Sequence, residues 1–226
     1  MSSGKYRGIA PGCRLLPVKV LDRRGNGNRK DVIKGLDWVI KNKKRYGIKV
    51  VNISVGTLQE GVEDELLVEA VEAAWDAGLT VIAAAGNMGP GEGTVTSPGS
   101  SRKVITVGAF DDENPAQAPK GIHMGYSGRG PTVSCILKPE ILAPGSGIVS
   151  CNSKFRYTKK AYIVKSGTSM ATPVVAGAAA LLLERYPEMS NLEVKIRMKA
   201  CADDLGRPKN QQGWGKINLE RLLKEN

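Results

Sequence analysis

The sequence predicts an α/β fold in which a parallel sheet is covered by helices on both faces. Two observations support this prediction. Strand-like and helix-like segments alternate along the 226 residues, and several strands are nearly continuous apolar runs, such as 80–85 (TVIAAA) and 104–109 (VITVGA). Apolar runs of this kind are typical of strands buried between two layers of helices. No repeat or linker interrupts the pattern, so we expect a single domain over residues 1–226.

The expected elements follow from apolar periodicity and from the glycines that end helices. In chain order they are a strand at 14–21, a helix from an N-cap at Asp31 to a stop at Gly47, a strand at 49–55, a helix at 63–77, strands at 80–85, 104–109 and 141–143, a buried helix that includes 174–183, and a last helix from about residue 192. Ser190 and Glu193 have the spacing of a capping box at the start of the last helix.

Composition and charge exclude several function classes. The longest apolar run, 174–183, is shorter than the ~18 residues that a membrane span requires. The first residues, MSSGKYRG, lack the apolar core of a secretory signal. We therefore expect no membrane partner and a cytoplasmic protein.

The formal net charge of +11 is partly concentrated in the clusters 41–45 (KNKKR) and 154–160 (KFRYTKK). No nucleic-acid-binding motif accompanies these clusters, so we expect solvated surfaces and no nucleic acid partner. Electrostatic attraction of acidic substrates is compatible with the same charge.

The four cysteines, at positions 13, 135, 151 and 201, are far apart and form no C-x-x-C pair. This spacing argues against a metal site. Four cysteines could form two disulfides, but a core of this size does not require them. Reduced, buried thiols are therefore the expectation.

The segment 166–173 (SGTSMATP) carries the strongest functional signal, because it places Ser169 among small residues at the start of an apolar helix. One interpretation is a helix N-cap, where serine is favoured. Pro173 fits either interpretation if it lies in the first turn. The other interpretation is a nucleophile that gains from the positive end of the helix dipole and whose own N–H faces a developing oxyanion. Asn87 follows the strand at 80–85 and is a candidate for a second oxyanion donor.

Five blocks of the sequence resemble, in the same order, those of the subtilisin-like serine proteases, or subtilases. They are 9–21 (IAPGCRLLPVKVL), 51–56 (VNISVG), 84–87 (AAGN), 138–145 (KPEILAPG) and 166–177 (SGTSMATPVVAG). The resemblance extends from about residue 6 to the C-terminus. It implies a serine endopeptidase that cleaves peptide or protein substrates through an acyl-enzyme on Ser169, with Asn87 in the oxyanion hole. Val174 stands where the family often has a histidine, which is not the triad base.

The resemblance also implies which residues line the substrate cleft. An extended substrate would pair as an added strand along two short segments, which are Gly25, Asn26 and Gly27 and Ser54, Val55 and Gly56. The residues that would surround the oxyanion asparagine are Ala85, Gly86, Met88 and Thr168. Met88 stands at a position of the pocket for P1, the substrate residue before the cleaved bond. Its apolar side chain predicts a neutral or hydrophobic P1. We expect no cofactor or metal, because loops for the calcium that is common in the family do not match here.

The catalytic base is not evident from the sequence. Triads of this family run Asp, His, Ser along the chain, and neither the D-[TS]-G nor the H-G-T-H type of motif occurs. The one histidine, His123, is expected in a surface loop, and Asp22 in the loop that flanks the substrate. We therefore expect that a segment preceding Met1, on the same or a separate chain, supplies the base. Alone, this chain would retain only residual activity.

The same resemblance places a missing aspartate strand between residues 15–21 and 50–54. Its absence would leave a slot with unpaired backbone groups, so we expect the chain alone to fold poorly or to self-associate. Two alternatives to a protease stay open. One is a non-catalytic remnant that binds peptides in the same cleft, and the other is a basic interaction protein on the same fold.

Overall fold

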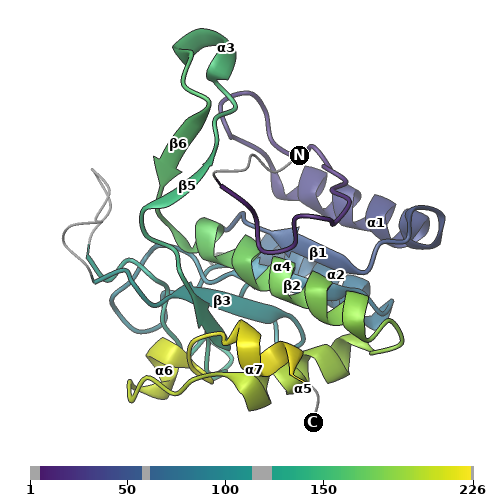
Figure 1. Ribbon diagram of the computed structural model, residues 1–226. Coiled ribbons are helices and arrows are strands. Elements are labelled where there is room, and N and C mark those ends of the chain that lie inside the picture. Colours follow the sequence, from purple (N-terminus) through teal and green to yellow (C-terminus); the bar gives the residue numbers. More distant parts are fainter. Residues whose placement is uncertain (1–5, 58–61, 114–123, 225–226) are drawn as a thin grey trace.

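The computed structural model describes residues 6–57, 62–113 and 124–224, and its centre is a four-stranded parallel sheet (Figure 1). The strand order is β1-β2-β3-β4. The strands are β1 Val50–Ile53, β2 Thr80–Ala84, β3 Ile105–Ala109 and β4 Ile141–Ala143. Every residue of β2, β3 and β4 is buried, as expected for apolar strands between helical layers. The predicted α/β fold with a parallel sheet is therefore confirmed.

Helices cover the sheet, and α4 lies across one face of it in the middle of the molecule (Figure 1). The helices are α1 Arg29–Tyr46, α2 Val62–Asp76, α3 Phe155–Thr158, α4 Thr168–Arg185, α5 Asn191–Cys201, α6 Lys209–Gln212 and α7 Leu219–Leu223. Helix α4 contains the apolar run 174–183, and its Ala178, Ala179 and Leu182 are fully buried. None of the helices in the described ranges is both long and apolar enough to cross a membrane.

The ends of the helices agree only in part with the positions that the sequence predicts. Helix α1 begins at an N-cap on Asn28, whose side-chain oxygen accepts a hydrogen bond from the Asp31 N–H at 2.8 Å. The prediction of Asp31 as the cap is therefore wrong, because Asp31 occupies the first turn and accepts from the Asn28 amide. Gly47 ends α1 at φ +65° as predicted. The capping box of Ser190 and Glu193 is also present.

A two-stranded antiparallel hairpin, which the sequence did not predict, stands apart from the main sheet. Strand β5 (Ile148–Cys151) pairs with β6 (Tyr162–Lys165), and α3 forms the tip between them. In Figure 1 the hairpin projects from the rest of the molecule. It leads directly into α4 and carries the basic cluster 154–160.

The strand expected at 14–21 is not formed. Within the described ranges, no backbone ladder joins these residues to another segment, and Leu15 is 87% exposed. Among the described residues, strand β1 lies at the end of the sheet and pairs only with β2. A strand-like sequence becomes a strand only when a neighbour satisfies its N–H and C=O groups, and the part of the chain that the structure describes offers no such neighbour to residues 14–21.

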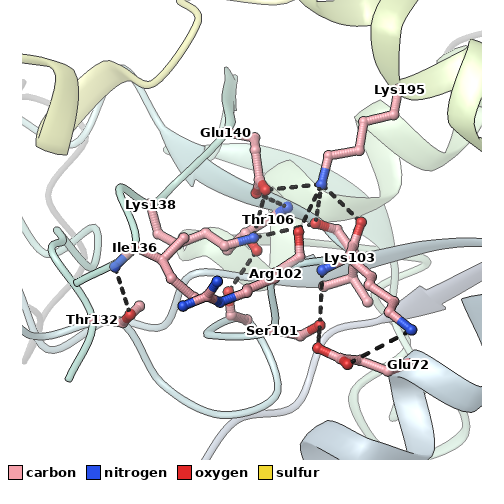
Figure 2. Close-up of polar contacts among 12 residues, drawn as sticks. Glu72, Ser101, Arg102, Lys103, Thr106, Thr132, Ile136, Lys138, Glu140 and Lys195 are labelled. Carbon is pink, nitrogen blue, oxygen red and sulfur yellow. Dashed lines mark hydrogen bonds and ion pairs between the residues drawn. The ribbon is translucent and has the colours of Figure 1, made fainter. Parts of the chain in front are cut away.

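A buried ionic network fixes the segments that lead into β3 and β4 (Figure 2). Lys138 is fully buried and donates to the Glu140 carboxylate at 2.5 Å. The other oxygen of Glu140 accepts the Thr106 N–H at 2.7 Å. Lys195 of α5 reaches the same carboxylate at 3.1 Å and the Lys103 carbonyl at 2.7 Å. Burial lowers the pKa of Lys138 to about 8, against the opposing attraction of Glu140.

The cysteines differ from the expectation in their location. All four are free, but Cys13, Cys135 and Cys151 are exposed and Cys201 is only partly buried. The expectation of buried thiols is therefore wrong. Three of them lie in the loops and on the hairpin that surround the sheet, outside the apolar strands and helices that make the core.

Candidate active site

Ser169 lies in the first turn of α4, which begins close to the carboxyl end of β1. The N-cap of this helix is Gly167, at φ +143°, and no side chain caps it. The interpretation of Ser169 as a plain N-cap is therefore wrong. Its hydroxyl instead donates to the Ser54 carbonyl oxygen at 3.0 Å, which places it next to the residues that follow β1.

Pro173 also lies further into α4 than expected. It is inside the helix, beyond the first turn. A proline at this position cannot donate the usual helical hydrogen bond to the carbonyl four residues earlier, which is that of Ser169. The start of α4 is held instead by other contacts, such as the Thr172 hydroxyl, which donates to the Thr168 carbonyl at 2.7 Å.

Asn87 is held against the start of α4 in one orientation. Its Oδ1 accepts the Thr168 N–H at 2.9 Å and lies 3.1 Å from the Thr168 hydroxyl oxygen. Because a backbone N–H can only donate, the contacting atom must be the amide oxygen. The Nδ2 group of Asn87 is then on the other side of the amide and available to a ligand. Thr168 Oγ1 also accepts the Gly86 N–H at 3.1 Å, which closes this small network.

Two hydrogen-bond donors border the same pocket as the Ser169 hydroxyl. One is the Asn87 amide, and the other is the N–H of Ser169, which has no acceptor among the described residues. Unpaired N–H groups in the first turn of a helix carry the positive end of its dipole. Such donors can stabilise the negative oxygen that develops when a nucleophile attacks a carbonyl group.

The pocket at this site has a volume of about 230 Å³. It brings together six of the residues that the sequence singled out, which are Gly56, Gly86, Asn87, Met88, Thr168 and Ser169, and it adds Ala84 and Thr96. None of the side chains in this lining is charged. Met88 is 53% exposed. The arrangement can therefore accept a small or apolar group beside the Ser169 hydroxyl.

Thr96 is the residue that the sequence reasoning missed. A Cβ atom on Gly56 would lie 2.5 Å from Thr96 Oγ1, and one on Gly86 would collide with the same side chain. Gly86 also has φ +92°, which side chains rarely tolerate. Thr96 thus explains why both positions are glycine. No local pattern could have found it, since the contact joins residues that are distant in the sequence.

Other predicted substrate residues lie elsewhere. Gly25, Asn26 and Gly27 belong to a loop at a separate, open groove of about 660 Å³, whose lining includes Asn26 and Gly27. Ala85 is fully buried, and its N–H and C=O are bonded to Val107 and Thr96. The Ala85 side chain therefore cannot contact a substrate.

Ser54 contributes its carbonyl group to Ser169, and Val55 lies between Ser54 and the pocket-lining Gly56 without lining the pocket itself. Asp22 is engaged in its own turn, where its Oδ1 accepts the N–H groups of Arg24 and Asn26 at 2.7 and 2.9 Å. These bonds, that of Asn26 first, lower the pKa of Asp22.

The site contains a serine hydroxyl beside two N–H donors, but the described residues do not show a base. The Ser54 carbonyl that contacts Ser169 can orient the hydroxyl but cannot take its proton. His123 lies outside the described residues. Among the residues that the structure describes, no cluster of potential metal ligands is found either.

Known proteins of one family match this chain in sequence and in fold. The family described as "Subtilase family" matches residues 2–215. The serine protease AprX of Bacillus subtilis is 42% identical over 98% of this chain, and subtilisin DY of Bacillus licheniformis is 34% identical over 94% of it. The chain spans 54% of the length of AprX and 69% of that of subtilisin DY. Among solved structures, sphericase superposes with a TM-score of 0.77 at 29% identity, covering 94% of this chain and 70% of its own.

Proposed function

Because the chain belongs to the subtilase family of serine proteases, we propose that it forms the nucleophile and oxyanion half of a serine endopeptidase site. Ser169 is the nucleophile, and its own N–H and the Asn87 amide bind the oxyanion. The observation that supports this most strongly is the hydrogen bond from the Thr168 N–H to Asn87 Oδ1. It leaves the amide NH₂ free beside Ser169, at the pocket that both residues line.

The chemistry follows from these roles. The Ser169 oxygen attacks the carbonyl carbon of the substrate, and the carbonyl oxygen becomes an anion that the two donors stabilise. Collapse of this intermediate releases the amine and leaves an ester on Ser169, which water then hydrolyses. The hydroxyl proton must pass to a base and from it to the leaving amine. The described residues offer no such base, so the chain alone should be almost inactive towards peptide bonds.

We propose that a second polypeptide segment, from the same gene or a separate chain, supplies the aspartate and the histidine. Strand β1 has an open edge, and the strand-like residues 14–21 have no ladder partner in the described ranges. The groove near these residues is lined partly by the apolar side chains of Val18, Val20 and Leu21. An inserted strand would pair with β1 and cover this apolar surface.

The substrate is proposed to be an extended polypeptide that lies along Ser54, Val55 and Gly56. The uncharged lining of the pocket supports a neutral or hydrophobic P1 residue. With the complemented chain, a panel of peptides that differ only at P1 should be cleaved fastest after an apolar residue. Fastest cleavage after Lys or Glu would contradict this specificity.

The proposal is tested by labelling Ser169 with a fluorophosphonate, which reacts only with an activated serine. The chain is mixed with a synthetic polypeptide that carries a D-[TS]-G strand and an H-G-T-H helix of the family. We expect labelling only in the mixture, and none with Ser169→Ala. Labelling that persists in Ser169→Ala would overturn the assignment, as would an unlabelled mixture in which hydrogen exchange proves that the polypeptide is bound to β1.

A non-catalytic peptide-binding protein is the second candidate. The observation that favours it is that the Ser169 hydroxyl already donates to Ser54, while the pocket is formed without any added segment. This candidate predicts that a peptide binds equally well to the chain and to Ser169→Ala, and that complementation produces no labelling. Labelling of the complemented chain decides against it.

A further inference from the structure

The β5–β6 hairpin carries a concentration of positive charge that the proposed active site does not use. Residues 151–165 contain five basic and no acidic residues; the basic ones are Lys154, Arg156, Lys159, Lys160 and Lys165. None of these five forms an ion pair with any described residue. Two exposed aromatic side chains lie among those at the tip, Phe155 at 50% and Tyr157 at 88% exposure. Charges and rings are thus presented together to the solvent.

The tip of the hairpin is an ordered structure held by one asparagine. The Asn152 amide donates to the Thr158 hydroxyl and to the Lys160 carbonyl, both at 2.9 Å. Its Oδ1 accepts the Lys154 N–H at 3.0 Å. These bonds set the backbone positions of the charged residues before any ligand arrives. A pre-arranged surface loses less entropy on binding than a flexible loop.

The hairpin is attached directly to the proposed nucleophile. At its base, the Gly147 N–H donates to Ser166 Oγ and the Gly167 N–H donates to the Gly145 carbonyl, each at 2.9 Å. Strand β6 then continues through Ser166 and Gly167 into α4 (Figure 1). Lys160 precedes Ser169 by nine residues, which corresponds to a reach of at most about 30 Å in an extended chain.

We propose that this hairpin is a second binding surface for the substrate and takes an acidic stretch of polypeptide. This second binding surface rests on the proposed function, because an acidic stretch bound there would lie within about nine substrate residues of the peptide bond that Ser169 attacks. A polypeptide fits better than another polyanion for two reasons. The surface is continuous with a site for peptide bonds, and each hairpin strand has a free edge in the described ranges that can pair with a main chain.

The ligand predicted by this surface has carboxylates interleaved with apolar residues. Carboxylates would pair with the exposed cations, and an apolar or aromatic residue would pack on Phe155 or Tyr157. Exposed ion pairs contribute little one by one. Several of them acting together give an affinity difference on the order of tenfold at low ionic strength, which salt then weakens.

The test compares two fluorescent peptides with the same neutral core, one flanked by glutamates and one by glutamines, by anisotropy at low ionic strength. The hairpin variant replaces Lys154, Arg156, Lys159 and Lys160 with Gln. The control variant replaces Lys41, Lys44, Arg45 and Lys199 with Gln, which removes the same charge from exposed positions on α1 and α5. We expect the glutamate peptide to bind the unmodified chain and the control about tenfold more tightly than the glutamine peptide. The hairpin variant should lose this preference.

An equal loss in both variants would overturn the proposal, because it would trace the preference to net charge. A preference that survives in the hairpin variant would also overturn it, provided circular dichroism shows both variants folded. Oligothymidylate and vesicles of anionic lipid are measured beside the peptides. Tighter hairpin-dependent binding of either would assign the surface to nucleic acid or to membrane instead. These measurements need no catalysis, so they remain informative if fluorophosphonate labelling of Ser169 fails.

Discussion

The two ends of the strand order differ in how completely they are paired and buried. We call strands β2, β3 and β4 the completed side of the sheet, and β1 with residues 14–21 the open side. Strands β2, β3 and β4 are entirely buried, whereas β1 has one buried residue, Ile53. Residues 14–21 are as apolar as many strands, yet Leu15 and Leu16 are 87% and 45% exposed. Apolar, β-branched sequence is thus not sufficient for a strand. It becomes one only where a neighbour on the sheet satisfies its backbone.

Ser169 lies at the border between these two sides. In the proposed function the completed side supplies the oxyanion donors, since Asn87 follows β2 and is fixed by Thr168 of α4. The open side begins at β1, whose following residue Ser54 contacts the Ser169 hydroxyl. We therefore propose that oxyanion binding belongs to the completed side and proton transfer to the segment that fills the open one.

The largest expected effect concerns the completed side of the site. Replacing Asn87 with Ala removes one oxyanion donor, and loss of the oxyanion asparagine of subtilisin is known to cost about 10²–10³ in rate. We expect a loss of this order in the rate at which the complemented chain cleaves a peptide. Thr168→Val keeps the backbone N–H that holds the Asn87 amide and removes only the hydroxyl contacts to Asn87 and Gly86, so its loss should be smaller. Equal rates for Asn87→Ala and the unmodified chain would remove Asn87 from the oxyanion hole.

The two sides should also differ in their contribution to stability. Leu182→Ala leaves a cavity in the buried core and should lower the free energy of unfolding by about 2–5 kcal/mol. The same substitution at Leu15, which is 87% exposed, should change it by less than about 0.5 kcal/mol. Urea denaturation followed by circular dichroism measures both. Similar losses at the two positions would mean that residues 14–21 are packed in solution.

Lys138 provides a smaller, pH-dependent test of the completed side. Its pKa is about 8 in the folded chain and ordinarily 10.5, so above about pH 8 the folded state binds fewer protons than the unfolded state. Stability should therefore rise between about pH 8 and 10.5, by up to about 1.4 kcal/mol per pH unit from this group. The rise should be absent in Lys138→Met.

Lys103 is the matched control for this test. A hydrogen bond to Asp76 raises its pKa, so its contribution is present below its ordinary pKa and is lost as the pH rises above it. Lys103→Met should therefore keep the rise in stability above pH 8. A rise that persists in Lys138→Met would assign it to another group.

The open side is also expected to make the chain self-associate. An unpaired edge strand with exposed apolar neighbours is a site for intermolecular pairing. Sedimentation velocity should show oligomers that increase with concentration and decrease when the synthetic complementing polypeptide is added. A monomer with a sharp two-state unfolding transition would count against an open edge.

Much of the completed side could be predicted from the sequence alone. Strands β2, β3 and β4 were found because burial on both faces leaves an unmistakable apolar run. Ser169 and Asn87 were found because their surrounding residues are typical of the family. Asn28 was missed as a cap because Asp31 is an equally good capping residue three positions later.

The features that depend on contacts distant in sequence could not be predicted. Thr96 is defined as a site residue only by its contact with Gly56 and Gly86. The β5–β6 hairpin has a basic tip of 154–160 without a recognisable turn signal. The segment 14–21 has the sequence of a strand, but its structure depends on a partner that the described residues do not include.

Hydrogen exchange of the native chain tests the central claim most directly. We predict that the amides of β2 and β3 exchange slowly, close to the limit set by global unfolding, while those of residues 14–21 exchange almost as fast as in an unfolded chain. Adding the complementing polypeptide should slow exchange in residues 14–21 and in β1, together with the onset of Ser169 labelling. Protection of residues 14–21 equal to that of β2 in the chain alone would contradict the account.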